Sequence, residues 1–283
     1  MSNQTVTSAD IRAAEHPLTC LTCYDFLTAR VMDRVAELDM ILVGDSLGMV
    51  SLGYESTLPV TVDDMVHHTA AVSRGVNRAF VVADVPFMSM AKSKSHAVTV
   101  AQRLMQEGGA QAIKIEGGER HREVINHLVS HDVPVVGHLG LTPQSVEAMG
   151  GYKLQANEPD KIKQLSMDAN ILQKAGVLSI VLECIPAEVG DALTMKLDVP
   201  TIGIGAGNGC DGQVLVWQDM MGLSDTDPPK FVKEYDQFGD HFADKIREYC
   251  NDVRNRDFPD EEHSFTLGED VSMDQVKDWV DVK

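Results

Sequence analysis

Short apolar segments alternate with amphipathic segments along most of the chain. The apolar segments are rich in Val, Ile and Leu and predict eight β-strands, over residues 18–25, 40–46, 80–86, 112–118, 134–140, 178–186, 200–207 and 212–217. Their nearly continuous hydrophobicity is typical of parallel strands that are buried on both faces of a sheet. We therefore expect a parallel sheet that is covered by helices.

The segments between these strands carry apolar residues at helical spacing. The expected helices cover residues 63–75, 96–110, 122–132, 160–176 and 187–198. In the first of them, Met65 and Val72 lie on one face, as in an amphipathic helix that packs on a core. Two further helices are expected, one over 8–16 before the first strand and one over 231–250 as the last outer helix.

Eight strands that alternate with helices over about 240 residues predict a (β/α)8 barrel, the TIM-barrel fold, whose usual size is about 250 residues. An open, doubly wound sheet is the main alternative, because alternation alone does not show whether a sheet closes. No repeat or Pro/Gly/Ser-rich linker interrupts the chain. We expect one barrel domain over 1–263, including the added N-terminal helix, and an acidic C-terminal extension over 264–283.

Charge and composition limit the kinds of molecule that we expect this protein to bind. The chain has 24 basic and 43 acidic residues, a net charge of −19, and 5 cysteines. Nucleic acids and anionic membranes require a basic surface, so neither is an expected partner. No apolar stretch approaches the ~20 residues that span a bilayer, and the first residues lack the pattern of a signal peptide. We expect a cytoplasmic protein with small-molecule ligands, since an odd number of cysteines suits a reducing compartment.

Ionisable side chains gather at the carboxyl ends of the predicted strands, where the active sites of such barrels lie. They are Asp45 and Ser46, Asp84, Lys114 and Glu116, His138, and Glu183. Lys114 and Glu116 share one face of their strand, because side chains alternate along a strand. A simple ion pair between these two is one interpretation. Four carboxylates against one lysine favour a bound cation, and oxygen ligands favour Mg²⁺ over zinc.

Other motifs carry weaker signals. Cys20 and Cys23 form a C-x-x-C pair inside a strand, which favours buried, inert thiols over a metal site. The glycine-rich segment 203–212 does not match the spacing of the standard nucleotide loops, so tight packing and phosphate binding both remain open. His67 and His68 fall on a predicted helix, where a structural or surface role is expected.

Several long segments give the sequence a family resemblance. They are LVGDSLGMVSLGY (42–54), STLPVTVDDMVHHT (56–69), VVADVPF (81–87), KIEGG (114–118), GHLGLTPQSVEAMGGYK (137–153), VLECIPAE (181–188) and TIGIGAGNGCDGQVLVW (201–217). From about Leu18 to His263, the sequence resembles the ketopantoate hydroxymethyltransferases of pantothenate biosynthesis. The resemblance implies a barrel of the phosphoenolpyruvate/pyruvate superfamily type and a homo-oligomer, commonly a homodecamer.

The same resemblance implies a reaction and a set of site residues. A one-carbon transferase of this family passes a hydroxymethyl group from 5,10-methylenetetrahydrofolate to 3-methyl-2-oxobutanoate and depends on Mg²⁺. By resemblance, the metal ligands would be Asp45, Asp84 and Glu116. The keto acid would contact Asp45, Ser46, Asp84, Lys114 and His138. Glu183 would be the proton acceptor.

Three other functions remain open from the residues alone. The first is a Mg²⁺-dependent lyase or mutase of the same superfamily, which would share the carboxylates. The second is a Schiff-base aldolase that uses Lys114 as its nucleophile. The third is a non-catalytic barrel that binds a 2-oxo acid, because a fold does not by itself establish an activity.

Overall fold

The structure, a computed structural model, describes residues 5–224 and 227–280. The chain divides into two compact units, Met1–Tyr235 and Asp236–Lys283, and each is described by itself. The expected division into a barrel domain over 1–263 and an extension over 264–283 stays a prediction.

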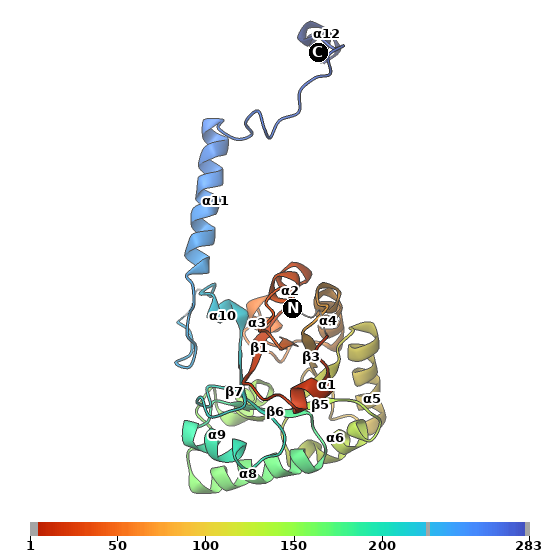
Figure 1. The fold of residues 1–283 in the computed structure, drawn as a ribbon, viewed down its shortest axis with the longest axis vertical. Helices are drawn as coiled ribbons and strands as arrows, with labels where there is room; N and C mark the ends of the chain where they lie inside the picture. The colour runs from red at the N-terminus through yellow and green to blue at the C-terminus, as the bar shows by residue number, and fades with distance from the viewer. Residues whose placement is uncertain (1–4, 225–226, 281–283) are drawn as a thin grey trace. The chain divides into compact units, whose positions relative to one another are not determined.

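The eight strands of the first unit are parallel and close into a barrel in chain order (Figure 1). They are β1 (Leu18–Thr22), β2 (Met40–Val43), β3 (Phe80–Asp84), β4 (Ala112–Glu116), β5 (Val135–Gly140), β6 (Ser179–Glu183), β7 (Thr201–Ile204) and β8 (Gly212–Leu215). Each strand lies within the segment that its hydrophobicity predicts. The pairing of Leu18 on β1 with Gly212 on β8 closes the sheet. The barrel prediction is therefore confirmed, and the open sheet is excluded.

Helices connect most of the strands around the barrel (Figure 1), and a short helix before β1 adds Ile11 to the apolar cluster inside it. They are α1 (Ser8–Arg12), α2 (Phe26–Met32), α3 (Leu47–Val50), α4 (Val62–Gly75), α5 (Lys94–Gln102) with the π-turn η1 (Arg103–Glu107), η2 (Glu119–His121), α6 (Arg122–Val129), η3 (Pro143–Ser145), α7 (Val146–Met149), α8 (Pro159–Lys174), α9 (Ala187–Thr194) and α10 (Trp217–Met220). The sequence pattern does not predict α2, because this short helix buries only Ala29 and Met32.

Side chains alternate between two apolar clusters along each strand. On β4, Ile113 and Ile115 belong to the outer cluster between sheet and helices, whereas Ala112 belongs to the cluster inside the barrel. Because a strand has a period of two residues, Lys114 and Glu116 share the inner face with Ala112. The barrel interior is thus apolar at the start of the strand and charged at its carboxyl end.

The cysteine pair and the glycine-rich segment have structural explanations. Cys20 and Cys23 are buried and free, and burial raises the pKa of each thiol to about 12. The prediction that these thiols are buried is confirmed, and their raised pKa is consistent with low reactivity. Gly207 has a φ of 81°, and a Cβ atom there would lie 2.4 Å from the Cβ of Ala187. This close approach supports packing as the reason for glycine at that position.

The second unit contains α11 (Phe238–Asn255) and α12 (Met273–Trp279). The helix predicted over 231–250 begins only at Phe238, because the preceding residues form turns in which the amide of Val232 donates to Pro229. None of the residues of α11 is buried. One face of this helix exposes Phe242, Ile246, Tyr249 and Val253. Within the described residues, no helix has the length and hydrophobicity that a membrane crossing requires.

Candidate active site

A cavity of about 350 Å³ opens at the carboxyl ends of the barrel strands. It is lined by all seven side chains that the sequence predicts for the site, Asp45, Ser46, Asp84, Lys114, Glu116, His138 and Glu183. Five of them are only 2–4% exposed, namely Asp45, Asp84, Lys114, Glu116 and His138. The strand register explains part of this arrangement, because Asp84 lies opposite Lys114 and Glu116 lies opposite His138 on the neighbouring strand.

Lys114 lies at the centre of the charged group. Its Nζ is 3.0 Å from Asp84 Oδ1 and 3.0 Å from His138 Nδ1. Burial acts to lower the pKa of Lys114, but the charges of Asp84, Glu116 and Asp45 outweigh it and raise the pKa above its ordinary value. Lys114 therefore keeps its proton. A Schiff-base nucleophile must lose that proton, so the environment of Lys114 argues against an aldolase of that type.

His138 lies between two carboxylates. Its Nε2 is 3.0 Å from Glu183 Oε2, although that nitrogen is not aligned for a hydrogen bond, and its Nδ1 is 3.6 Å from Glu116 Oε1. Burial and the charge of Lys114 act to lower the pKa of His138, but the two carboxylates outweigh them and raise it. Histidine at this position therefore connects Glu183 to the buried charges.

Asp45 and Asp84 are held against each other at the ends of β2 and β3. The backbone amide of Asp45 donates to Asp84 Oδ2 over 3.0 Å. Glycine at position 44 leaves room for the side chain of Ser46, since a Cβ atom there would lie 2.7 Å from Ser46 Oγ. Burial and the negative charges of Asp84 and Glu116 raise the pKa of Asp45 well above its ordinary value. Burial also raises the pKa of Asp84, although Lys114 acts in the opposite direction.

The carboxylates have the chemistry of a magnesium site. Asp84 Oδ1 is paired with the Lys114 ammonium at 3.0 Å and Glu116 Oε1 lies 3.6 Å from His138 Nδ1. Four carboxylates against one lysine at this end of the cavity still leave an excess of negative charge, which a bound cation would offset. Within the described residues, no three His, Cys, Asp or Glu side chains are already gathered closely enough to enclose an ion. Mg²⁺ needs only one or two carboxylates, because it keeps several of its waters. The donor set fits Mg²⁺ better than zinc, which prefers histidine and cysteine.

Gln144 joins the site although the sequence analysis did not single it out. This residue of η3 donates through its backbone amide to Glu116 Oε2 over 3.0 Å. Its side-chain Nε2 donates to Asp45 Oδ2 over 2.7 Å and to the carbonyl oxygen of Val85 over 2.8 Å. Because both side-chain partners only accept, the NH₂ group must face them. A neutral residue gives no charge signal in the sequence, and only its place after the fifth strand pointed to the site.

Tyr24 holds the side chain of Ser46 in place. The hydroxyl groups of Tyr24 and Ser46 are 2.8 Å apart and share a hydrogen bond. His68 Nδ1 donates to the carbonyl oxygen of Tyr24 over 2.7 Å, which confirms the structural role expected for His68. Ser46 is therefore the one predicted site residue that is held mainly by neutral groups.

The β7–β8 side of the same cavity has a different character. Its lining side chains are mostly apolar and include Ile204, Val214, Val216, Phe231 and Val232. Asp219 of α10 also lines this side, and burial raises the pKa of its carboxyl. The cavity thus has a charged part formed by β2–β6 and an apolar part formed by β7, β8 and the segment that follows.

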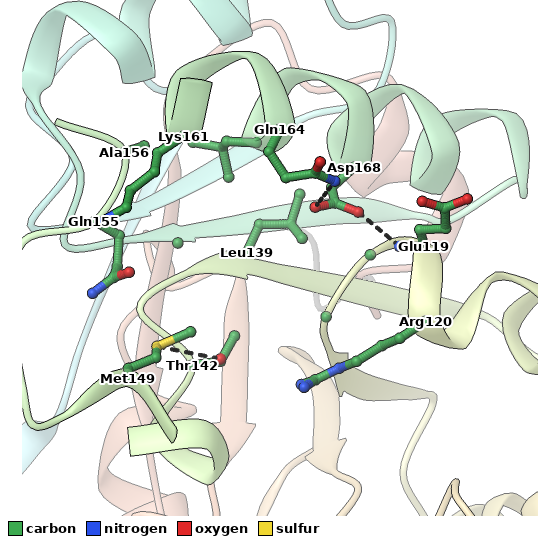
Figure 2. Close-up of a pocket in the computed structure, with 14 residues that line it drawn as sticks. Glu119, Arg120, Leu139, Thr142, Met149, Gln155, Ala156, Lys161, Gln164 and Asp168 are labelled. Atoms are coloured by element: carbon green, nitrogen blue, oxygen red, sulfur yellow. Dashed lines mark hydrogen bonds between the residues drawn. The ribbon is translucent and has the colours of Figure 1, made fainter. Parts of the chain in front are cut away.

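A second, larger cavity of about 400 Å³ lies outside β4 and β5, against α8 (Figure 2). There Asp168 accepts hydrogen bonds from the amide of Glu119 over 2.7 Å and from Gln164 Nε2 over 3.1 Å. None of the seven predicted site residues is among the described residues that line it. Cavity size therefore does not identify the functional site, whereas the convergence of buried charge does.

Comparison with known sequences gives a consistent result. A family model described as ketopantoate hydroxymethyltransferase matches residues 4–261. The chain is 54% identical over 263 residues to the 3-methyl-2-oxobutanoate hydroxymethyltransferase of Thermoanaerobacter sp. (strain X514), which covers 93% of this chain and 96% of the relative. It is 52% identical over 248 residues to the enzyme of the same name from Syntrophus aciditrophicus (strain SB), covering 88% and 91%.

Solved structures resemble the chain in fold. Phosphonopyruvate hydrolase has a TM-score of 0.60 at 11% identity, with 97% of this chain and 94% of that chain covered. 2,3-Dimethylmalate lyase, a member of the PEP mutase/isocitrate lyase superfamily, has a TM-score of 0.59 at 15% identity, with 97% and 91% covered. These structures agree with the closed barrel fold of the chain.

Proposed function

The chain belongs to the ketopantoate hydroxymethyltransferase family, and from this premise we propose that its charged cavity transfers a hydroxymethyl group from 5,10-methylenetetrahydrofolate to 3-methyl-2-oxobutanoate. The product would be 2-dehydropantoate (ketopantoate), an intermediate of pantothenate biosynthesis. The observation that carries the proposal is the convergence of four carboxylates, one lysine and one histidine on a single cavity at the carboxyl ends of five strands.

Glu183 is the proposed proton acceptor. The reaction must remove a proton from C3 of the keto acid before that carbon can attack the folate methylene group. The side chain of Glu183 is 14% exposed, whereas the side chains of Asp84 and Glu116 are 4% and 2% exposed and Asp45 is buried. A base that reaches the substrate needs such access, and correct placement contributes about 10²–10⁴-fold to the rate.

Lys114 and His138 have complementary roles in the proposal. Lys114 keeps its positive charge and would stabilise negative charge on the keto acid, since preorganised charge in a water-poor site is effective. His138, 3.0 Å from Glu183, would orient the base. Ser46 would donate a hydrogen bond to the substrate from its position beside Asp45.

A divalent cation is the proposed cofactor, held by Asp45 and Asp84 with Glu116 nearby. When bound, Mg²⁺ would supply Lewis-acid stabilisation to the substrate oxygen that gains charge as the C3 proton leaves. The excess of carboxylates over Lys114 at this end of the cavity and the raised pKa of Asp45 support this assignment, because a cation would offset the buried negative charge. The protein residues fix the position of the charge, and Gln144 holds Asp45 in place.

An assay of ketopantoate formation tests the proposal directly. Purified protein with 3-methyl-2-oxobutanoate, methylenetetrahydrofolate and Mg²⁺ should form ketopantoate, and chelation of the metal with EDTA should abolish the rate. Cleavage of the keto acid or isomerisation without folate would instead favour a lyase or mutase of the same superfamily. Binding of the keto acid with no turnover would favour a non-catalytic barrel.

Assembly and location complete the proposal. We propose a homo-oligomer, with a homodecamer as the form that the family resemblance implies, and the exposed apolar face of α11 supports contact with a second chain. Sedimentation velocity at the mass of one chain would contradict it. The described free cysteines support a reducing, cytoplasmic location.

A further inference from the structure

The whole cavity, of about 350 Å³, is larger than a small branched keto acid needs. The charged part is formed by β2–β6, and a small branched keto acid that sits beside Glu183 leaves the β7–β8 side free. That side offers Ile204, Val216 and Phe231 as apolar walls. Flat aromatic ligands bind in clefts of this kind, in which apolar walls surround a few well-placed polar groups.

Asp219 is the polar group on this side that lacks a structural explanation. It lines the cavity from α10, next to Val216, and it is partly buried. Within the described residues, its carboxylate has no hydrogen bond or ion pair, although Lys230 lines the same cavity. Burial raises the pKa of the Asp219 carboxyl. Because Asp219 lines the cavity and has no protein partner among the described residues, its carboxylate is available to hydrogen-bond donors of a ligand in the cavity.

We propose that Asp219 anchors the pterin ring of the folate co-substrate, an inference that rests on the proposed function. The pterin presents an N3–H and a 2-amino group side by side, and this pair of donors matches a carboxylate as a guanidinium group does. The ring would lie between Val216 and Phe231. Glu183 and Asp219 line the same cavity, so a folate whose pterin is bound by Asp219 would bring its methylene group toward C3 of the keto acid.

The substitution Asp219→Asn tests the proposal, because it keeps the size of the side chain and removes its charge. Two measurements distinguish an effect on the keto acid from an effect on the folate. Exchange of the C3 proton of 3-methyl-2-oxobutanoate with D₂O, followed by NMR, needs Glu183 and the metal but no folate. We expect Asp219→Asn to retain this exchange within about twofold. The KM for methylenetetrahydrofolate should rise about 10- to 100-fold, as expected for a lost charge-assisted pair.

Binding of tetrahydrofolate, which lacks the transferable carbon, provides a readout apart from turnover. Calorimetry should show weaker binding to Asp219→Asn by a similar factor, with unchanged binding of the keto acid. Asp227→Asn is the matched control, because Asp227 is exposed and does not line the cavity. It should behave as the parent protein does. If Asp219→Asn is poorly folded, Asp219→Ser is the second variant. Retained exchange of the C3 proton would show that this variant is folded.

The outcomes separate this inference from the proposed function. If the parent protein exchanges the C3 proton and forms ketopantoate but Asp219→Asn has a parental folate KM, the pterin assignment is overturned. Equal losses of exchange and transfer in a folded variant would also overturn it, because Asp219 would then act on the keto acid or on the fold. A parent protein that neither exchanges the proton nor transfers the group would instead overturn the proposed function.

Discussion

The two ends of the barrel use the same residue, aspartate, in different ways. At the amino ends of the strands, Asp33 accepts hydrogen bonds from the backbone amides of Asn77, Arg78 and Ala79 over 2.8–3.0 Å. Asp39 accepts one from the amide of Thr19 over 2.9 Å. These carboxylates hold neighbouring segments together, and backbone donors satisfy them.

At the carboxyl ends, Asp84 and Glu116 each accept only one backbone hydrogen bond among the described residues, and the carboxylates lie close to other charged side chains. Burial and like charge raise the pKa of Asp45, and the second oxygens of Asp84 and Glu116 lie against the charged groups of Lys114 and His138 and not against backbone amides. Such an arrangement destabilises the protein alone and persists where a ligand compensates it. The comparison teaches that the partners of a carboxylate, more than its burial, distinguish a structural role from a functional one.

The largest effect is expected from Glu183→Gln at the carboxyl end. Loss of the proton acceptor should lower kcat about 10²–10⁴-fold, while the keto acid still binds in the presence of Mg²⁺. Steady-state kinetics and calorimetry measure the two quantities. Glu188→Gln, on the exposed part of α9, is the control and should keep full activity. A Glu183→Gln variant with parental kcat would remove Glu183 from the mechanism.

Asp45→Asn should separate function from stability at the same end. It should weaken binding of Mn²⁺, used as a probe for Mg²⁺, about 100-fold, since one charged ligand is lost. Without metal, the variant should be more stable than the parent, because the folded parent must bury a charge that resists ionisation.

The difference in stability between Asp45→Asn and the parent should depend on pH in a definite direction. A carboxyl whose pKa is raised in the folded protein favours folding at low pH, and this contribution is lost as the pH rises toward the folded pKa. The advantage of Asp45→Asn should therefore be absent near pH 4, about the ordinary pKa of aspartate, and grow above it. Urea denaturation in EDTA at several pH values measures it. A variant that is less stable than the parent at every pH would contradict this interpretation of Asp45.

Asp33→Ala should give the opposite result at the amino ends. Loss of a carboxylate that accepts three backbone hydrogen bonds should reduce the free energy of unfolding by about 2 kcal/mol. The kcat and KM values should not change below the melting temperature. Thermal denaturation and steady-state kinetics test the two statements. A large loss of activity in the folded variant would remove the contrast between the two ends.

Gln144→Met should produce the smallest effect. Methionine keeps the length of the side chain but cannot donate to Asp45 Oδ2, whereas the backbone bond to Glu116 is retained. We expect binding of Mn²⁺ to weaken about tenfold, the value of one hydrogen bond to a charged group, with little change in melting temperature. Gln164→Met removes a similar amide–carboxylate bond at Asp168 (Figure 2) and should leave Mn²⁺ binding unchanged. Equal affinities in both variants would exclude a positioning role for Gln144.

The sequence predicts the barrel and most of the charged site because both depend on local periodicity. Continuous apolar strands identify the sheet, and the phase of β4 places Lys114 and Glu116 inside it. The sequence does not predict Gln144 or the proposed role of Asp219, because both depend on how segments far apart in the chain come together around the cavity. The start of α11 at Phe238 escapes for a related reason, since Phe231 and Val232 line the cavity instead of a helix face.

Anomalous scattering from crystals that contain Mn²⁺ and 3-methyl-2-oxobutanoate tests the central claim most directly. We predict one strong peak within about 2.2 Å of oxygens from Asp45 and Asp84, with the keto acid beside it and the Glu183 carboxylate facing C3. A peak at the amino ends of the strands, or a keto acid bound away from Glu183, would contradict the proposal that the carboxyl ends of the barrel hold the reaction.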